Sequence, residues 1–95
     1  MIYVDDLVLH ATSPLGRREW CHMIADSLDE LHAMASRIGM RPAWFQPRSF
    51  PHYDLVASRR ARAVRLGAIE CDRRIFVGHL QRIRAGLSAA PAGHQ

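Results

Sequence analysis

The sequence contains no lysine, so all thirteen of its basic residues are arginine. The guanidinium group binds phosphate or carboxylate through two parallel hydrogen bonds, a geometry that an ammonium group does not offer. Codon bias in a GC-rich genome is an alternative explanation, and both can hold. Against nine acidic residues the formal net charge is +4, which permits binding of nucleic acid but does not demonstrate it.

Signals for export and membrane insertion are also absent. No apolar run approaches the roughly 18 residues that a membrane helix requires. The first ten residues, MIYVDDLVLH, carry two aspartates among their apolar residues and no basic segment before them, unlike a signal peptide. We therefore expect a cytoplasmic protein that makes no membrane contact.

Several common functional motifs are missing. Cys21 and Cys71 are the only cysteines, and they form neither a CxxC pair nor a zinc-type spacing. Both lie in apolar stretches, which favours reduced, buried cysteines over a disulfide or a ligand role. No Walker loop, GxGxxG or GxSxG is present, which excludes ordinary NTPases, dinucleotide-binding proteins and hydrolases with a nucleophile elbow.

The length of 95 residues is that of one domain with a thin core. We expect a single α/β domain over residues 1–87. Residues 88–95, SAAPAGHQ in the printed sequence, show no periodicity and predict a flexible C-terminal tail.

Apolar patterning predicts strands alternating with helices. Ser27 and Glu30 form an S-x-x-E capping box at the start of the first helix, and Gly39 ends it. Strands alternating with helices indicate a short, mostly parallel sheet of about three to four strands flanked by three helices. The expected strands are residues 2–8, 19–25 and 68–71, with 43–46 as a strand or loop; the other expected helices are 56–66 and 72–85.

The chain resembles a small uncharacterised family, a domain of unknown function found in bacteria and their phages. The matching stretches are YVDD (3–6), CHMIAD (21–26), DELHAMASRIGM (29–40), WFQ (44–46), HYDL (52–55) and SRRARAVRLGAIE (58–70). The resemblance extends to about residue 84 and implies no established activity. Its phage association suggests, by analogy alone, an antagonist of host defence. It places seven polar residues in the signature stretches: Asp5, Asp6, His22, Asp26, His32, His52 and Asp54.

His52 and Asp54 are two positions apart, so in extended backbone both side chains point to the same side. An imidazole beside a carboxylate can bind a divalent metal, or the carboxylate can orient the imidazole as a general base. The structural alternative is that Asp54 caps the second helix while His52 binds a loop carbonyl.

Asp5 and Asp6 end the first strand, where carboxylates often bind metal in phosphoryl-transfer enzymes. Neighbouring strand residues face opposite ways, so at most one of the two can join a given site. The alternative is a turn aspartate. His22 in the second strand and His32 at the margin of the first helix are further candidates, each with a structural role as its alternative.

The second helix carries an arginine-rich face, which is either solvated or in contact with phosphate. A phosphate bound at the amino end of that helix would meet Arg59 or Arg60. Trp44 and Phe45 either stack on nucleobases or pack against the sheet.

Two classes of function remain open beside a third interpretation, a structural or interaction protein without any ligand, and the sequence does not decide whether the protein is an enzyme. In the first, a metal-dependent phosphoesterase or nuclease-like domain acts on a nucleotide or nucleic acid. In the second, a non-catalytic module binds a nucleotide, a nucleic acid or a protein partner; a homo-oligomer fits either, given the small size. The first class assigns catalytic roles to His32, His52 and Asp54. It assigns the binding of Mg²⁺, Mn²⁺ or Zn²⁺ to Asp5, Asp6, His22, His52 and Asp54. Phosphate binding is assigned to Arg59 and Arg60.

Overall fold

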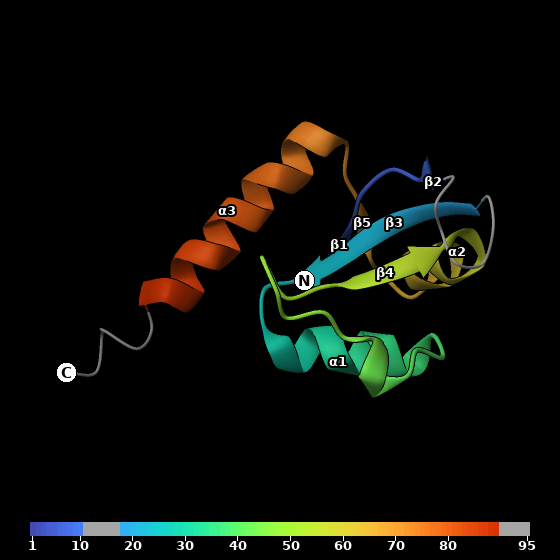
Figure 1. Ribbon diagram of the computed structural model, residues 1–95, viewed down its shortest axis with the longest axis horizontal. Coiled ribbons are helices and arrows are strands. Elements are labelled where there is room, and N and C mark those ends of the chain that lie inside the picture. Colours follow the sequence, from blue (N-terminus) through green and yellow to red (C-terminus); the bar gives the residue numbers. More distant parts are fainter. Residues whose placement is uncertain (11–17, 90–95) are drawn as a thin grey trace.

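A computed structural model describes residues 1–10 and 18–89. The chain forms one α/β domain in which a five-stranded mixed sheet carries three α-helices (Figure 1). The elements in chain order are β1 (Ile2–Val4), β2 (Val8–His10), β3 (Arg18–Ala25), α1 (Leu28–Arg37), the 3-10 turn η1 (Pro42–Trp44), β4 (Tyr53–Val56), α2 (Ala57–Arg65), β5 (Ile69–Glu70) and α3 (Arg73–Ala89).

The sheet is organised around β3, which pairs with three other strands. Residues 18–20 of β3 pair with β2, residues 23–25 pair with β1, and residues 20–23 pair with β4. All three pairings are antiparallel, and the only parallel pairing among the described residues joins β1 to β5. The α/β class and the three helices are therefore confirmed, whereas the expectation of a mostly parallel sheet is wrong.

The connections explain that difference. A parallel pair requires a crossover that returns the chain to its starting edge, usually through a helix. Between β1 and β3 the chain forms no helix in the described residues, and the expected strand 2–8 instead breaks into β1 and β2 around Asp5 to Leu7. Between α1 and β4, residues 38–52 carry the chain back along the sheet once more, so β4 runs opposite to β3. Strand β4 (Tyr53–Val56) was not among the expected strands, and its last residue was expected to begin the second helix.

Helix α1 forms where the capping signals predict it. The Ser27 hydroxyl accepts a hydrogen bond from the Glu30 backbone amide at 3.2 Å and donates one to the Glu30 carboxylate at 3.1 Å. Beyond the C-cap, Gly39 has φ of 85°, a left-handed conformation that glycine adopts without a Cβ penalty. Helix α3 continues through Ala89, two residues into the segment expected as a tail, and residues 90–95 lie outside the described residues.

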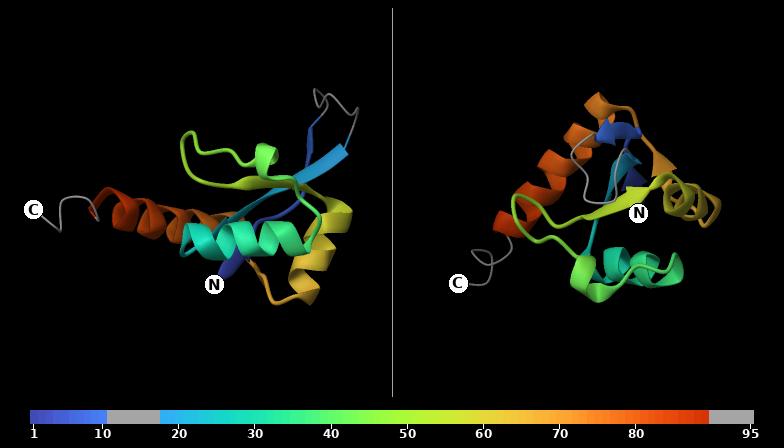
Figure 2. Two further views of the ribbon diagram at one scale, coloured as in Figure 1. Left: turned by 90° about the horizontal axis from the view of Figure 1, so that it is seen from below. Right: turned by 45° about the vertical axis from the view of Figure 1, so that its right-hand side comes forward.

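Strand alternation divides the buried side chains into two clusters, one on each face of the sheet. Cys21, Met23, Tyr53 and Leu55 point to the face covered by α1 and α2. The opposite face holds a smaller cluster beneath α3: Tyr3, Ile24, Cys71, Phe76 and Ile83. Figure 2 shows α3 on the other side of the strands from α1. None of the helices in the described part of the chain combines the length and apolarity needed to cross a bilayer.

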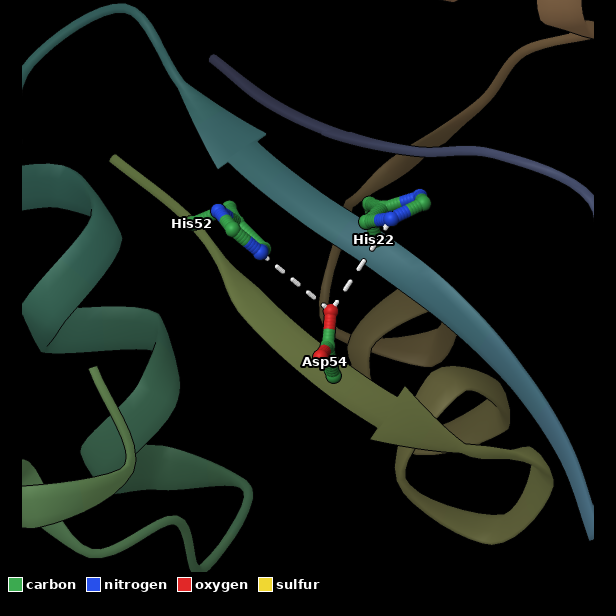
Figure 3. Close-up of side chains that lie close together, drawn as sticks. All are labelled: His22, His52 and Asp54. Atoms are coloured by element: carbon green, nitrogen blue, oxygen red, sulfur yellow. Dashed lines mark ion pairs between the residues drawn. The ribbon is translucent and has the colours of Figure 1, made fainter. Parts of the chain in front are cut away.

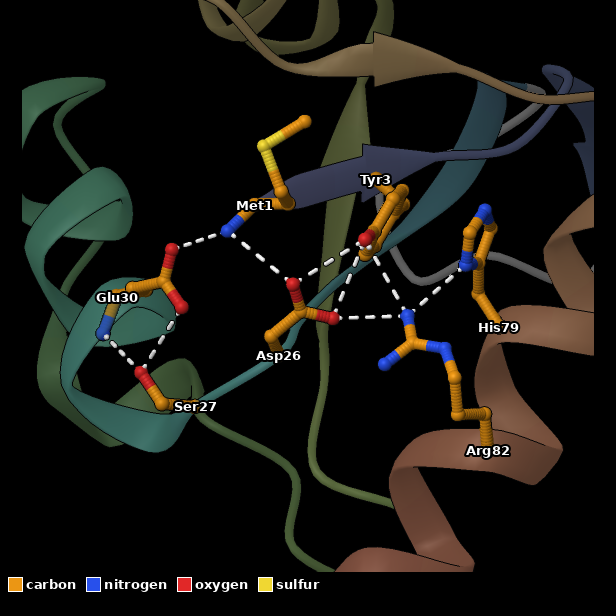
Figure 4. A network of polar contacts seen from close by, with 7 residues as sticks. All are labelled: Met1, Tyr3, Asp26, Ser27, Glu30, His79 and Arg82. Atoms are coloured by element: carbon orange, nitrogen blue, oxygen red, sulfur yellow. Dashed lines mark hydrogen bonds and ion pairs between the residues drawn. The ribbon is translucent and has the colours of Figure 1, made fainter.

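A polar network fastens α3 to the sheet (Figure 4). The Arg82 guanidinium donates to Asp26 Oδ1 at 2.8 Å, to the Tyr3 hydroxyl at 3.3 Å and to His79 Nδ1 at 2.9 Å. The His79 ring stacks on Tyr3 with centroids 3.9 Å apart. His79 therefore packs against an aromatic ring of the sheet.

The two cysteines are free and buried, as expected. Burial in the core raises the pKa of the Cys21 thiol to about 12, and burial likewise raises the pKa of Cys71. Because the thiolate is the reactive form, we expect both thiols of the native protein to resist a disulfide reagent such as DTNB and both to react rapidly in urea. Cys21→Ala and Cys71→Ala variants assign each thiol, and labelling within seconds under native conditions would contradict the burial.

The α3 network predicts a pH dependence of stability. Burial alone would raise the pKa of Asp26, but hydrogen bonds from Arg82 and Tyr3 bring it below its usual value. A lowered native pKa means that the carboxylate stabilises the fold above the unfolded pKa of about 3.9, and that this contribution is lost as pH falls through the native pKa. The Tm difference between wild type and Asp26→Asn should therefore be present at pH 6 and shrink below about pH 4. A difference that stays constant to pH 2 would contradict this role.

Candidate metal centre

Three side chains predicted as ligands converge on the α3 side of the sheet. His22, His52 and Asp54 each offer one ligand atom, and these atoms lie within 4.8 Å of one another (Figure 3). The register of β3 and β4 creates this cluster, because it places His22 directly opposite Asp54. His52 stands two residues before Asp54 in extended chain, so its side chain emerges on the same face.

The His22 ring is oriented by Asp5. His22 Nδ1 lies 2.8 Å from Asp5 Oδ2, while Asp5 Oδ1 accepts the backbone amide of His22 at 2.6 Å. A carboxylate oxygen only accepts, so Nδ1 carries the proton and Nε2 is the nitrogen left to bind a ligand. The hydrogen bond to Asp5 raises the pKa of His22, and the positive charge of Arg73 opposes that rise.

The His52 ring is oriented by its own loop. Its Nδ1 donates to the carbonyl oxygen of Phe50 at 2.8 Å, and the Phe50 ring stacks on it with centroids 4.3 Å apart. His52 is 8% exposed, the only polar residue buried this far among those described. Its Nε2 therefore points into the cluster, 3.4 Å from Asp54 Oδ1.

The Asp54 carboxylate is shared between an outer partner and the cluster. Gln46 Nε2 donates to Oδ2 at 2.7 Å, which leaves Oδ1 facing His52 at 3.4 Å and His22 at 4.0 Å. Burial would raise the pKa of Asp54, but the hydrogen bonds from His52 and Gln46 bring it below its usual value. The carboxylate is thus held in its charged form.

The cluster is suited to a cation. A neutral imidazole with its proton on Nδ1 turns an Nε2 lone pair toward the Asp54 carboxylate, and this contact becomes favourable with either a proton or a metal ion between the two atoms. Two imidazole nitrogens and one carboxylate oxygen form a common donor set for Zn²⁺ and for Fe²⁺, with further positions open. Bond lengths of about 2.0–2.2 Å require ligand atoms roughly 3.0–3.6 Å apart. The observed 3.4 Å fits, the 4.0 Å requires closure by about half an ångström, and the third pair, His22 to His52, is bounded only by 4.8 Å.

Each of the three ligands also has an outer hydrogen-bond partner. Such partners fix the tautomer and direction of metal ligands and are as characteristic of metal sites as the ligands themselves. They are Asp5 for His22, the Phe50 carbonyl for His52 and Gln46 for Asp54. Sequence reasoning did not find Gln46 or Phe50, since no spacing rule links a loop residue to the strand that it bridges; the only signal was the presence of WFQ in a signature stretch.

The remaining predicted acids and histidine lie elsewhere. Asp5 borders the cluster as the partner of His22, and Asp6 is exposed and outside it. His32 lies on α1 at the other face of the sheet, where its Nδ1 bonds to the Tyr53 hydroxyl at 2.8 Å. Convergence of His32 with the other histidines, expected from sequence, is therefore wrong. Adjacent residues Tyr53 and Asp54 point to opposite faces, and this alternation separates the two groups.

Of the two predicted phosphate-binding arginines, only Arg60 makes close contacts with other described residues. Arg60 donates to the Asp5 carbonyl at 2.8 Å and pairs with Glu70 at 2.9 Å. Arg59 approaches the Gly39 carbonyl at 3.5 Å, on the α1 side. The amino end of α2 is capped by Val56 without a side-chain hydrogen bond, so the alternative reading of Asp54 as a helix cap is also wrong.

Apolar and unpaired groups surround the cluster. The rings of Phe50 and Phe76 lie 5.9 Å and 6.2 Å from the His22 ring. Trp20 precedes His22 by two residues on the same strand face, and its buried indole N–H has no hydrogen-bond partner among the described residues. A donor left in this state normally costs about 1–3 kcal/mol.

Comparison with known proteins gives a family but no activity. Neither a curated protein nor a solved structure matches the chain significantly. One family model matches residues 2–83, and it is described as a protein of unknown function, DUF4031. That match spans nearly the whole described chain and includes His22, His52 and Asp54, and the protein belongs to the DUF4031 family.

Proposed function

We propose that this protein binds a divalent metal through His22, His52 and Asp54 and uses it to hydrolyse a phosphate ester of a nucleotide or nucleic acid. The observation that carries the proposal is the convergence of three ligand atoms within 4.8 Å, two of them on imidazoles with protonated, hydrogen-bonded Nδ1 atoms. A structural zinc site normally closes its coordination with four protein ligands, whereas three leave room for water.

The donor set narrows the choice of metal. Mg²⁺ prefers an octahedral shell of oxygen ligands, while imidazole nitrogen suits Zn²⁺, Fe²⁺ and, in mixed sets, Mn²⁺. With two nitrogens and one oxygen, the site favours these ions over Mg²⁺. Asp5 and Gln46 keep the ligands aimed at the metal.

The chemistry would follow from the open positions. A metal ion held by His22, His52 and Asp54 would supply hydroxide from water near neutral pH and would stabilise negative charge on the phosphate. In the overall hydrolysis a P–O bond from water replaces the ester P–O bond, and the leaving oxygen takes a proton from solvent. The Trp20 N–H and the Arg73 guanidinium are the proposed donors to the phosphate oxygens. At this centre they would take the role that the sequence assigned to Arg59 and Arg60.

Metal binding is the first expected result. Zn²⁺ and Mn²⁺ should raise the Tm of the wild type, since a ligand at 100 times its Kd stabilises the native state by about 2.7 kcal/mol. His52→Ala and Asp54→Asn should abolish the response. Gln46→Ala should weaken binding by roughly 10- to 100-fold, the usual cost of losing an outer partner. Calorimetric titration measures the affinities.

His32→Ala is the matched control, because it removes an imidazole that lies on the opposite face. It should retain the full metal response. An equal response in His32→Ala and Asp54→Asn, or none in the wild type with either ion, would exclude this metal site.

Hydrolysis is the second expected result. The Mn²⁺- or Zn²⁺-loaded wild type should cleave bis-p-nitrophenyl phosphate or an oligonucleotide, EDTA should stop the reaction and added metal should restore it. Asp54→Asn should lose more than the roughly 100-fold upper bound typical of an outer partner, and His32→Ala should stay close to wild type. Metal binding without turnover of any phosphate ester would instead favour the non-catalytic binding module.

A further inference from the structure

The surface around η1 carries an exposed aromatic ring beside two cations. Trp44 is 42% exposed, although an indole normally packs away from water. The guanidinium carbons of Arg41 and Arg59 lie over the Trp44 ring, 5.9 Å and 5.4 Å from its centre. Arg41 is the N-cap of η1 and so is a sequence neighbour of Trp44, whereas Arg59 is brought to them from α2 by the fold.

Neither cation has an acidic partner among the described residues. Arg60 and Arg82, by contrast, pair with Glu70 and Asp26 at 2.9 Å and 2.8 Å. The hydrogen bond of Arg59 to the Gly39 carbonyl, at 3.5 Å, is at the limit of a normal contact. Both guanidinium groups therefore keep donors and a full positive charge for an external anion.

The ring stands on a fixed support. The neighbouring Phe45 packs against His32 and Tyr53, with ring centroids 4.6 Å and 5.6 Å apart. Pro42 begins the 3-10 turn and fixes its own φ. An indole ring held in this way loses little conformational entropy when a ligand stacks on it.

We propose that Trp44, Arg41 and Arg59 form a binding site for single-stranded nucleic acid, in which an unpaired base stacks on the indole and the adjoining phosphates pair with the two guanidinium groups. Every base has a π-face, so such a site tolerates many sequences. In a duplex the base faces are already stacked on one another. A duplex can therefore bind the two arginines through its phosphates but cannot stack a base on Trp44. The sequence left stacking and burial open for Trp44 and Phe45. Phe45 is partly buried against the core, and Trp44 is exposed.

This site does not rest on the proposed hydrolysis. Phe45, the neighbour of Trp44, packs against the core on the α1 side of the sheet, whereas His22 lies beside Phe76 of α3. Figure 2 shows α1 and α3 on opposite sides of the strands. The two sites can therefore be tested separately.

The test is the affinity of the full chain for a fluorescein-labelled 12-mer of deoxythymidine, measured by anisotropy in EDTA. Trp44→Ala should weaken binding roughly 5- to 150-fold, the range of one base–aromatic stack, and Trp44→Phe should restore most of it. Arg41→Ala and Arg59→Ala should each weaken binding and reduce the slope of log K against log salt by about 0.7. Arg84→Ala, an exposed arginine on α3, is the charge-matched control and should have little effect.

Inorganic polyphosphate, a polyanion without bases, separates stacking from charge. Its binding should fall in the arginine variants and be unchanged in Trp44→Ala.

The proposal is overturned if Trp44→Ala binds the oligonucleotide as tightly as wild type, if Arg84→Ala weakens binding as much as Arg59→Ala, or if a duplex binds as tightly as the single strand. A 12-mer affinity that requires Mn²⁺ and is lost in His52→Ala would place the oligonucleotide at the metal centre instead. Tighter binding of a polyglutamate peptide than of the 12-mer would overturn it in favour of an acidic protein partner.

Discussion

The proposed metal centre and the proposed nucleic-acid surface depend on one constraint, the antiparallel pairing of β3 with β4. It sets His22 opposite Asp54 and Met23 opposite Tyr53, so that one register supplies both the His/Asp cluster and the core. Slippage by one residue would turn the buried tyrosine to the cluster and the carboxylate into the apolar core. Burial of Tyr53 and Leu55, at 1% and 0% exposure, therefore also holds the ligand geometry in place.

The sequence predicted correctly those parts of the fold that depend on contacts between residues close together in the chain. The capping box of Ser27 and Glu30, the stop at Gly39 and the three helices follow from side chains within one turn of one another. The direction of the strands does not, because it depends on how residues 38–52 return across the sheet. The same distinction applies to the site. His52 and Asp54 share a side because of their spacing, whereas the partnership of His22 with Asp5 arises from a contact 17 positions apart.

Alternation along β4 separates two groups of polar and aromatic residues that the sequence places side by side. The cluster of His22, His52 and Asp54 faces α3, and Tyr53 turns to the other side to meet His32 and Phe45. The proposed metal centre and the proposed nucleic-acid surface are consequently back to back across one layer of strands. They can take different ligands without competing for space.

The outer hydrogen bonds of the cluster have a kinetic consequence. His52 is held by a carbonyl two residues away, Asp54 by a glutamine that bridges to the same loop, and His22 by an aspartate in the adjoining connection. No helix has to move for the three side chains to face one another, so the proposed metal would bind with little movement of the chain beyond the closure of about half an ångström between His22 and Asp54. Uptake of an ion at the proposed centre would then be limited by the loss of water from that ion and not by the chain.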